Sequence, residues 1–147
     1  LYFMTTSASE IVIPSNALVT SSGFTWLDEN GIIIAVGSNH QIHTLDHAIE
    51  NTKMIAGIAG QIRRPFLIDM TKVKTMSKDA REYYVGPEPK KSITAVAILT
   101  KSLVGKAVAN FFLLLTKPSI STRLFTDFDE AIEWLSQYKA APNNLDS

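Results

Sequence analysis

Two apolar runs, at 19–27 and 32–37, are rich in the β-branched and aromatic residues that favour strands. The polar segment DENG at 28–31 separates them. Its Asn30-Gly31 pair readily adopts the positive φ angles that a tight hairpin turn needs. The pattern therefore predicts an antiparallel β-hairpin near the start of the fold.

Apolar positions then recur at helical spacing over residues 45–59, which predicts an amphipathic helix. Thr44 is placed to cap its start, and Gly60 ends it. The polar segment QIRRP at 61–65 is typical of a loop. It leads into FLIDM at 66–70, a short unbroken apolar run of the kind found in strands that are buried on both faces.

Two further strand-helix units follow in the middle of the chain. Ser77 is placed to cap a short helix that extends to about Tyr84. ITAVAILT at 93–100 is the next predicted strand, and it precedes a predicted helix over 103–116. Because both faces of that helix are apolar, we expect other elements to cover it on more than one side.

The last predicted unit is a short strand at 122–126 with a helix after it. Asp127 and Glu130 have the spacing of a capping box at the start of this helix. Its apolar positions form one stripe, made of Phe128, Ala131, Ile132, Leu135 and Tyr138.

Strands that alternate with helices predict right-handed crossovers onto a mostly parallel sheet. We therefore expect an α/β fold with one domain at 18–139, about five strands, an antiparallel N-terminal hairpin and four helices. Residues 1–17 are expected to combine a tag remnant, LYF, with an extended arm. Residues 140–147 are expected to be a disordered tail.

Composition narrows the classes of partner and chemistry. The chain carries 14 basic and 14 acidic side chains, so no overall field steers it towards nucleic acid or an anionic membrane. It has no cysteine, which excludes thiolate catalysis and cysteine-ligated metals and fits a cytoplasmic location. No apolar segment reaches the roughly 20 residues that a membrane span needs.

Three stretches resemble the small bacterial SpoIIAA-like proteins, relatives of the STAS (sulphate transporter and anti-anti-sigma) domain. They are PFLIDMTKVKTMSKDAREYY at 65–84, NFFLLLTKP at 110–118 and TRLFTDFDEAIEWL at 122–135. The likeness covers residues 18–139, and many members of the closest subgroup are labelled STAS or SEC14 domain-containing. The resemblance implies the SpoIIAA-like fold and a protein partner, such as an anti-sigma-type kinase or another signalling protein.

Anti-anti-sigma factors carry a strand-end aspartate, from which a short loop leads to a phosphorylated serine at the next helix. The resemblance places Asp69 on that aspartate, Thr71 on the serine that follows it and Lys78 on the phosphorylated serine. A lysine does not accept phosphate as a hydroxyl does, and its charge is opposite to that of the phosphorylated form. The resemblance therefore implies that phosphorylation at this position does not control the protein.

The segment from Asp69 to Arg81 is the candidate site, because ligands and partners collect at the carboxyl ends of parallel strands. Structural roles compete with a functional one: the Asp69 carboxylate can fix its loop, and Ser77 can act only as a helix cap. Arg81 can pair with Asp69 or with a ligand anion, or can lie in solvent. The predicted partner-binding residues are Asp69, Thr71, Lys72, Lys74, Ser77, Lys78 and Arg81.

The histidines suggest a metal site, since His40, His43 and His47 lie within eight residues together with Asp46. As the helix cap, however, Thr44 leaves His43 outside the helix, so the rings of His43 and His47 are expected to diverge. We therefore predict no metal site.

The leading hypothesis is a non-enzymatic, STAS-like interaction or regulatory domain without a cofactor, because no nucleophile, base and orienting group occur together. The alternative is a SEC14-like carrier of a lipid or another small apolar ligand, held beneath the helix at 103–116. Gly105 and Ala109 share one face of that helix and permit close approach of a second copy, so a homodimer is also an expectation.

Overall fold

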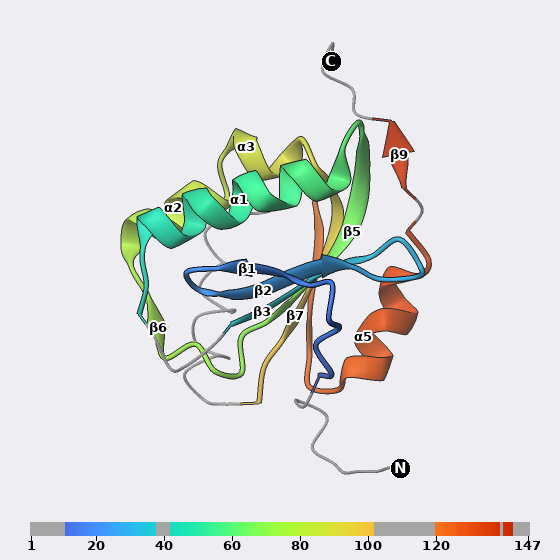
Figure 1. The fold of residues 1–147 in the computed structure, drawn as a ribbon, viewed down its shortest axis with the longest axis horizontal. Helices are drawn as coiled ribbons and strands as arrows, with labels where there is room; N and C mark the ends of the chain where they lie inside the picture. The colour runs from blue at the N-terminus through green and yellow to red at the C-terminus, as the bar shows by residue number, and fades with distance from the viewer. Residues whose placement is uncertain (1–10, 38–41, 102–119, 139, 143–147) are drawn as a thin grey trace.

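A mixed β-sheet organises the chain. The computed structural model describes residues 11–37, 42–101, 120–138 and 140–142. The sheet order is β1-β2-β3-β5-β7-β8, with antiparallel pairing among the first three strands and parallel pairing from β3 to β8 (Figure 1). The strands are β1 (Leu18–Thr20), β2 (Gly23–Leu27), β3 (Ile33–Gly37), β5 (Ile62–Asp69), β7 (Ile93–Leu99) and β8 (Ser121–Phe125). The predicted α/β class, with a parallel sheet and an N-terminal hairpin, is confirmed.

Helices cover both faces of this sheet. Figure 1 shows α1 (Leu45–Ala59), α2 (Lys78–Tyr84) and α3 (Pro87–Lys90) on one side and α5 (Phe128–Leu135) on the other. The sequence did not predict α3, which begins with a proline at its first position, where a missing N–H costs nothing. The predicted helix over 103–116 lies outside the described residues.

The alternation of side chains along β3 explains why its sequence is apolar throughout. Ile33 and Ala35 belong to the cluster that packs against α1, whereas Ile34 and Val36 belong to the cluster that packs against α5. Successive side chains of a strand point to opposite faces, so a strand covered on both sides has no polar face.

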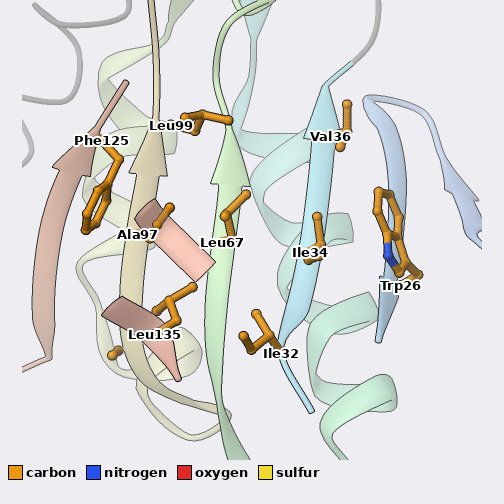
Figure 2. Packing of buried hydrophobic residues seen from close by; sticks show 11 residues of the cluster. Trp26, Ile32, Ile34, Val36, Leu67, Ala97, Leu99, Phe125 and Leu135 are labelled. Atoms are coloured by element: carbon orange, nitrogen blue, oxygen red, sulfur yellow. The ribbon is translucent and has the colours of Figure 1, made fainter. Parts of the chain in front are cut away.

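The cluster on the α5 side is the larger core. Figure 2 shows Leu135 lying across the strands that carry Leu67 and Ala97. Full burial of one such aliphatic side chain stabilises the fold by about 1.5–3 kcal/mol. Its buried members are Trp26, Ile32, Ile34, Val36, Leu67, Ala95, Ala97, Leu99, Phe125, Ala131 and Leu135.

The single strand predicted over 19–27 is two strands, so the sheet has six strands along its main path where about five were expected. A turn at Ser21 and Ser22 separates them, and Thr20 pairs with Gly23 across it. Gly23 has φ +153, and a Cβ there would lie 1.9 Å from the Val36 carbonyl oxygen. Only glycine fits this close approach of two backbones.

β5 begins earlier than predicted, because the polar segment at 61–65 belongs largely to the strand. Its first two residues pair antiparallel with β9 (Ala141–Pro142), so the prediction of a disordered tail over 140–147 is wrong for these two residues. Pro65 fits inside the strand at a register shift against β7. Irregular pairing of this kind accommodates a residue that has no N–H to donate.

The N-terminal arm also contributes to the core. Ile11 and Ala17 pack against the cluster on the α5 side, although the sequence placed the start of the domain at Leu18. From Ile11 onward, the first strand or helix does begin at Leu18. The arm is therefore part of the packed domain from Ile11 onward.

Two predicted helix starts differ in outcome. Thr44 caps α1 as predicted: its hydroxyl accepts from the His47 N–H at 3.4 Å, and its own N–H donates to His47 Nδ1 at 3.1 Å. Asp127 occupies the N-cap position of α5, but its side chain makes no capping hydrogen bond, so the predicted box with Glu130 is not formed.

Candidate functional site

The segment from Asp69 to Arg81 lies at the carboxyl edge of the sheet, between the end of β5 and the first turn of α2. A small parallel sheet that the sequence did not reveal holds its middle in place. β6 (Thr75–Met76) pairs with β4 (Ile42–His43), and the Ser77 N–H donates to the His43 carbonyl at 2.9 Å. The turn is therefore attached to the chain that precedes α1.

Asp69 is buried, with 2% of its surface exposed. Its Oδ1 accepts the Thr71 N–H at 2.9 Å, while its Oδ2 has no hydrogen-bond partner in the described part of the chain. Burial is the main cause that raises the pKa of this carboxyl, and the hydrogen bonds from Thr71 oppose it. The buried carboxylate of Asp69 therefore fixes the loop that follows β5.

Ser77 is the N-cap of α2, as the sequence predicted. Its hydroxyl accepts from the Ala80 N–H at 3.3 Å and donates to Asp79 Oδ1 at 2.5 Å. Lys78, the residue that follows, is exposed, and its Nζ lies 3.9 Å from Glu82 Oε2. An exposed ion pair of this kind contributes little stability.

Arg81 helps to hold the turn together. Its Nη1 donates to the Met76 carbonyl at 2.6 Å across the start of α2, and the side chain is half-buried. The sequence had suggested Asp69, a ligand anion or solvent as its environment. The carbonyl contact places Arg81 in the supporting structure of the site.

The exposed side chains of the segment are three lysines, Thr75 and Asp79, and Ile42 of β4 adjoins them. Lys72, Lys74 and Lys78 are exposed, and Ile42 is 56% exposed. Ile42 stands opposite Thr75 in the β4-β6 pair, next to Lys74 in the chain. We call Ile42, Lys72, Lys74 and Lys78 the basic surface; sequence reasoning missed Ile42 because it belongs to a different segment.

A buried chain of polar side chains lies behind this surface, and the sequence did not reveal it. His43 Nε2 lies 2.6 Å from the Tyr84 hydroxyl, which also accepts from Asn51 Nδ2 at 3.3 Å. The Thr25 hydroxyl donates to Asn51 Oδ1 at 3.5 Å. The available signal was Asn51 itself, an amide three residues after Ala48 on the apolar face of α1.

The two described histidines lie closer together than predicted. The ring centroids of His43 and His47 are 5.3 Å apart, so the expectation of diverging rings is wrong. His47 Nδ1 already accepts the Thr44 N–H. Within the described residues, which exclude His40, no group of three or more His, Cys, Asp or Glu side chains is placed to hold a metal.

A cavity lies between the carboxyl edge of the sheet and α1, and its polar lining includes Thr25, His43, Asn51 and Asp69. Its volume is about 20 Å³. That is room for about one water molecule, far less than a lipid needs. The space beneath residues 103–116, which the carrier hypothesis requires, lies outside the described residues.

Membrane association through a span has no structural basis in the part of the chain that is described. None of its helices combines the length and the apolar character that crossing a bilayer requires.

Comparison with solved structures defines the class of fold. An uncharacterized protein of the DUF3478 family from Shewanella loihica PV-4, which has a SpoIIAA-like fold, matches with a TM-score of 0.53 at 18% identity, over 82% of this chain and 90% of that one. The predicted SpoIIAA-like fold is thereby confirmed. Residues 25–139 match the model of a domain of unknown function, DUF7793, and the chain belongs to that family.

Two further comparisons add no functional argument. A protein of unknown function from Arthrobacter sp. FB24 is 25% identical over 82% of this chain and 97% of that one, with a TM-score of 0.32. No curated protein matches the chain.

Proposed function

We propose that this chain is a non-enzymatic interaction domain that binds an acidic protein partner on the basic surface. The carrying observation is that an exposed isoleucine, Ile42, pairs with Thr75 beside the exposed Lys74, in a segment that also exposes Lys72 and Lys78. Large aliphatic side chains gain by leaving water, about 1.5–3 kcal/mol on full burial. Lysines around such an anchor steer an acidic surface towards it.

The polar side chains behind this surface are occupied by structural hydrogen bonds, which favours a role in partner binding over a role in catalysis. Ser77 gives its hydroxyl to a helix cap, Asp69 gives one oxygen to Thr71, and Arg81 donates to a backbone carbonyl. Each of these side chains stabilises the position of the lysines. The proposal therefore assigns a structural task to Asp69, Thr71, Ser77 and Arg81, and partner contact to the basic surface.

Regulation by phosphate on the usual serine does not belong to the proposal. Lys78 occupies that position in the resemblance to anti-anti-sigma factors, and the neighbouring Ser77 hydroxyl is engaged at the start of α2. The partner that the resemblance suggests is a signalling protein, such as an anti-sigma-type kinase. Its contact surface would present carboxylates around an apolar recess.

The experiment is quantitative affinity capture from host lysate with the full chain as bait. The variant Lys74→Glu plus Lys78→Glu reverses two charges, and the separate variant Ile42→Ser removes the anchor. Loss of the anchor is expected to weaken binding by about tenfold, because about 1.4 kcal/mol corresponds to that factor. Proteins captured by the wild type should decrease strongly with both variants.

The matched control is Lys53→Glu plus Lys90→Glu, which makes the same charge change at exposed positions on α1 and α3. It should capture as much as the wild type. Capture that is unchanged in Lys74→Glu plus Lys78→Glu and in Ile42→Ser would show that the partner uses another surface, and the proposal would then be wrong.

A further inference from the structure

A second surface with complementary properties lies between the N-terminal arm and α5. It is an open groove of about 580 Å³. Much of its lining is apolar and comes from Ile11, Val12, Trp26, Leu27, Ile34 and Phe128, and Val12 is 88% exposed. A volume of this size accommodates several side chains of a partner. We call this surface the acidic groove, for the reason given next.

Four carboxylates, those of Asp28, Glu29, Asp127 and Asp129, also line the groove, together with Pro14 and Asn16. Asp28 Oδ1 accepts the N–H groups of Asn30 and Ile32 and so shapes the β2-β3 turn. In the described part of the chain none of the four forms an ion pair, and no lysine or arginine lines the groove. The groove therefore combines exposed apolar surface with uncompensated negative charge.

The basic surface and the acidic groove cannot satisfy one another within a single molecule. The basic surface surrounds β6, and the groove adjoins α5; these two elements lie on opposite sides of the fold (Figure 1). One presents an apolar side chain among cations, and the other presents an apolar recess among anions. The chain as a whole is neutral, with 14 charges of each sign, so the complementarity comes from segregation of charge.

We propose that the acidic groove binds the basic surface of a second copy of this chain, with Ile42 seated against the apolar floor and the lysines facing the four carboxylates. This inference rests on the proposed function, since it names the partner of the same basic surface. The contact joins two different patches and is therefore heterologous, so each molecule keeps one free patch of each kind. Association then extends head to tail beyond two copies.

The test is analytical ultracentrifugation of the full chain over a range of concentrations at low and high salt. The average mass of the wild type should rise with concentration at low salt and fall on addition of NaCl, because the exposed charges are screened. The basic-surface variant, Lys72→Glu plus Lys74→Glu, reverses two charges of the basic surface. The groove variant, Glu29→Lys plus Asp129→Lys, reverses the rim at two exposed positions whose side chains form no ion pair within the described residues.

Each variant alone should remain monomeric, because one half of its contact is repulsive. Mixed in equal amounts, the two variants should associate again, since the intact groove of one meets the intact basic surface of the other and the two reversed halves are also opposite in charge. Lys53→Glu plus Lys90→Glu is the matched control for the charge change, and it should associate like the wild type. Circular dichroism verifies folding; if a charge reversal fails to fold, Ile42→Ser and Glu29→Gln plus Asp129→Gln replace it.

Three results would overturn the inference: a wild type that stays monomeric at every concentration and salt, self-association that neither variant reduces, or a mixture of the two variants that forms no complex. The failure of the proposed function is distinguishable from these. The wild type could stay monomeric and still capture another protein in a way that depends on the lysines and Ile42. That result would support the proposed function of the basic surface and would exclude only the second copy as its partner.

Discussion

The fold strongly disfavours the charged form of His43. This histidine is buried between β6 and α1, its Nε2 contacts the Tyr84 hydroxyl, and the ring of His47 lies beside it. Burial, with a smaller contribution from His47, lowers the pKa of His43 from 6.5 to about 4. The arrangement suits a neutral imidazole that accepts the tyrosine hydrogen, and protonation would place a charge in this buried chain.

The lowered pKa predicts a pH dependence of stability. Between pH 6.5 and about 4 the unfolded chain binds a proton at His43 that the folded chain does not. The stabilisation is therefore fully present above pH 6.5 and is lost as the pH falls towards 4, by about 3 kcal/mol in total. Urea unfolding of wild type and His43→Gln across this range should show the steeper loss in the wild type.

Asp69 makes the comparison with the variant necessary. Its raised pKa acts in the opposite direction, because a buried carboxyl whose folded pKa is raised loses stabilisation as the pH rises. Both proteins contain Asp69, so its effect cancels in the difference between them. Parallel profiles for the two proteins would show that His43 does not titrate as its burial implies.

At the scale of elements, substitutions of Ser77, the cap of α2, distinguish a structural role of this serine from a regulatory one. Ser77→Ala removes one of the two acceptors of the Ala80 N–H, which also donates to Asp79 Oδ1 at 2.9 Å, and should lower the free energy of unfolding by about 1 kcal/mol or less. Ser77→Asp retains a capping oxygen and adds negative charge, so it should keep the stability near that of the wild type. Chemical denaturation measures both.

Partner capture provides the contrast for these two variants. Neither should change capture on the basic surface at concentrations where the protein is folded, because Ser77 supports α2 and does not contact the partner in our proposal. A strong loss with Ser77→Asp alone would instead indicate a phosphate-sensitive position.

Two glycines give opposite predictions for the same substitution. Gly23→Ala places a Cβ 1.9 Å from the Val36 carbonyl at the β2-β3 pair and should destabilise the fold by several kcal/mol or prevent folding. Gly57→Ala lies in the exposed interior of α1, where a Cβ meets nothing within 4 Å. It should raise the free energy of unfolding by roughly 0.5–1 kcal/mol through helix propensity. Thermal or urea unfolding of both variants, compared with the wild type, measures these two changes in the free energy of unfolding.

At the scale of the whole molecule, the sheet order predicts where the native structure opens last. β5 and β7 each have strand neighbours on both sides, and helices cover their faces. The β4-β6 pair contains two residues from each segment and lies apart from the main sheet. Hydrogen exchange should therefore be slowest in β5 and β7 and much faster in β4 and β6. Comparable protection in both places would mean that the small sheet opens only with the core.

This distribution bears on function. The basic surface adjoins the β4-β6 pair, which we predict to exchange faster, whereas Asp69 belongs to a strand at the centre of the sheet. Binding surfaces are commonly built on the less stable parts of a rigid scaffold. In our proposal, partner binding on the basic surface should increase the protection of β4 and β6 and leave β5 unchanged.

The periodicity of apolar residues along the chain was sufficient to predict the strands and helices that local interactions specify. The alternation of strands and helices fixed the α/β class, and the capping residues Thr44 and Ser77 fixed two helix starts. Asn30-Gly31 marked the β2-β3 turn, where Gly31 has φ +82. These features depend on neighbours within one or two turns, so the sequence alone determines them. The resemblance to SpoIIAA-like proteins supplied the fold type that the structural comparison confirms.

Tertiary structure decided what depends on segments distant in the chain. The β4-β6 pair joins residues 42–43 to 75–76, the β5-β9 pair joins residues 62–63 to 141–142, and neither leaves a local pattern. For the same reason Ile42 could not be placed beside the lysines, nor the arm beside α5, from the order of residues. The sequence determined the elements and the lysines, and only long-range pairing and packing assembled them into two surfaces of opposite charge.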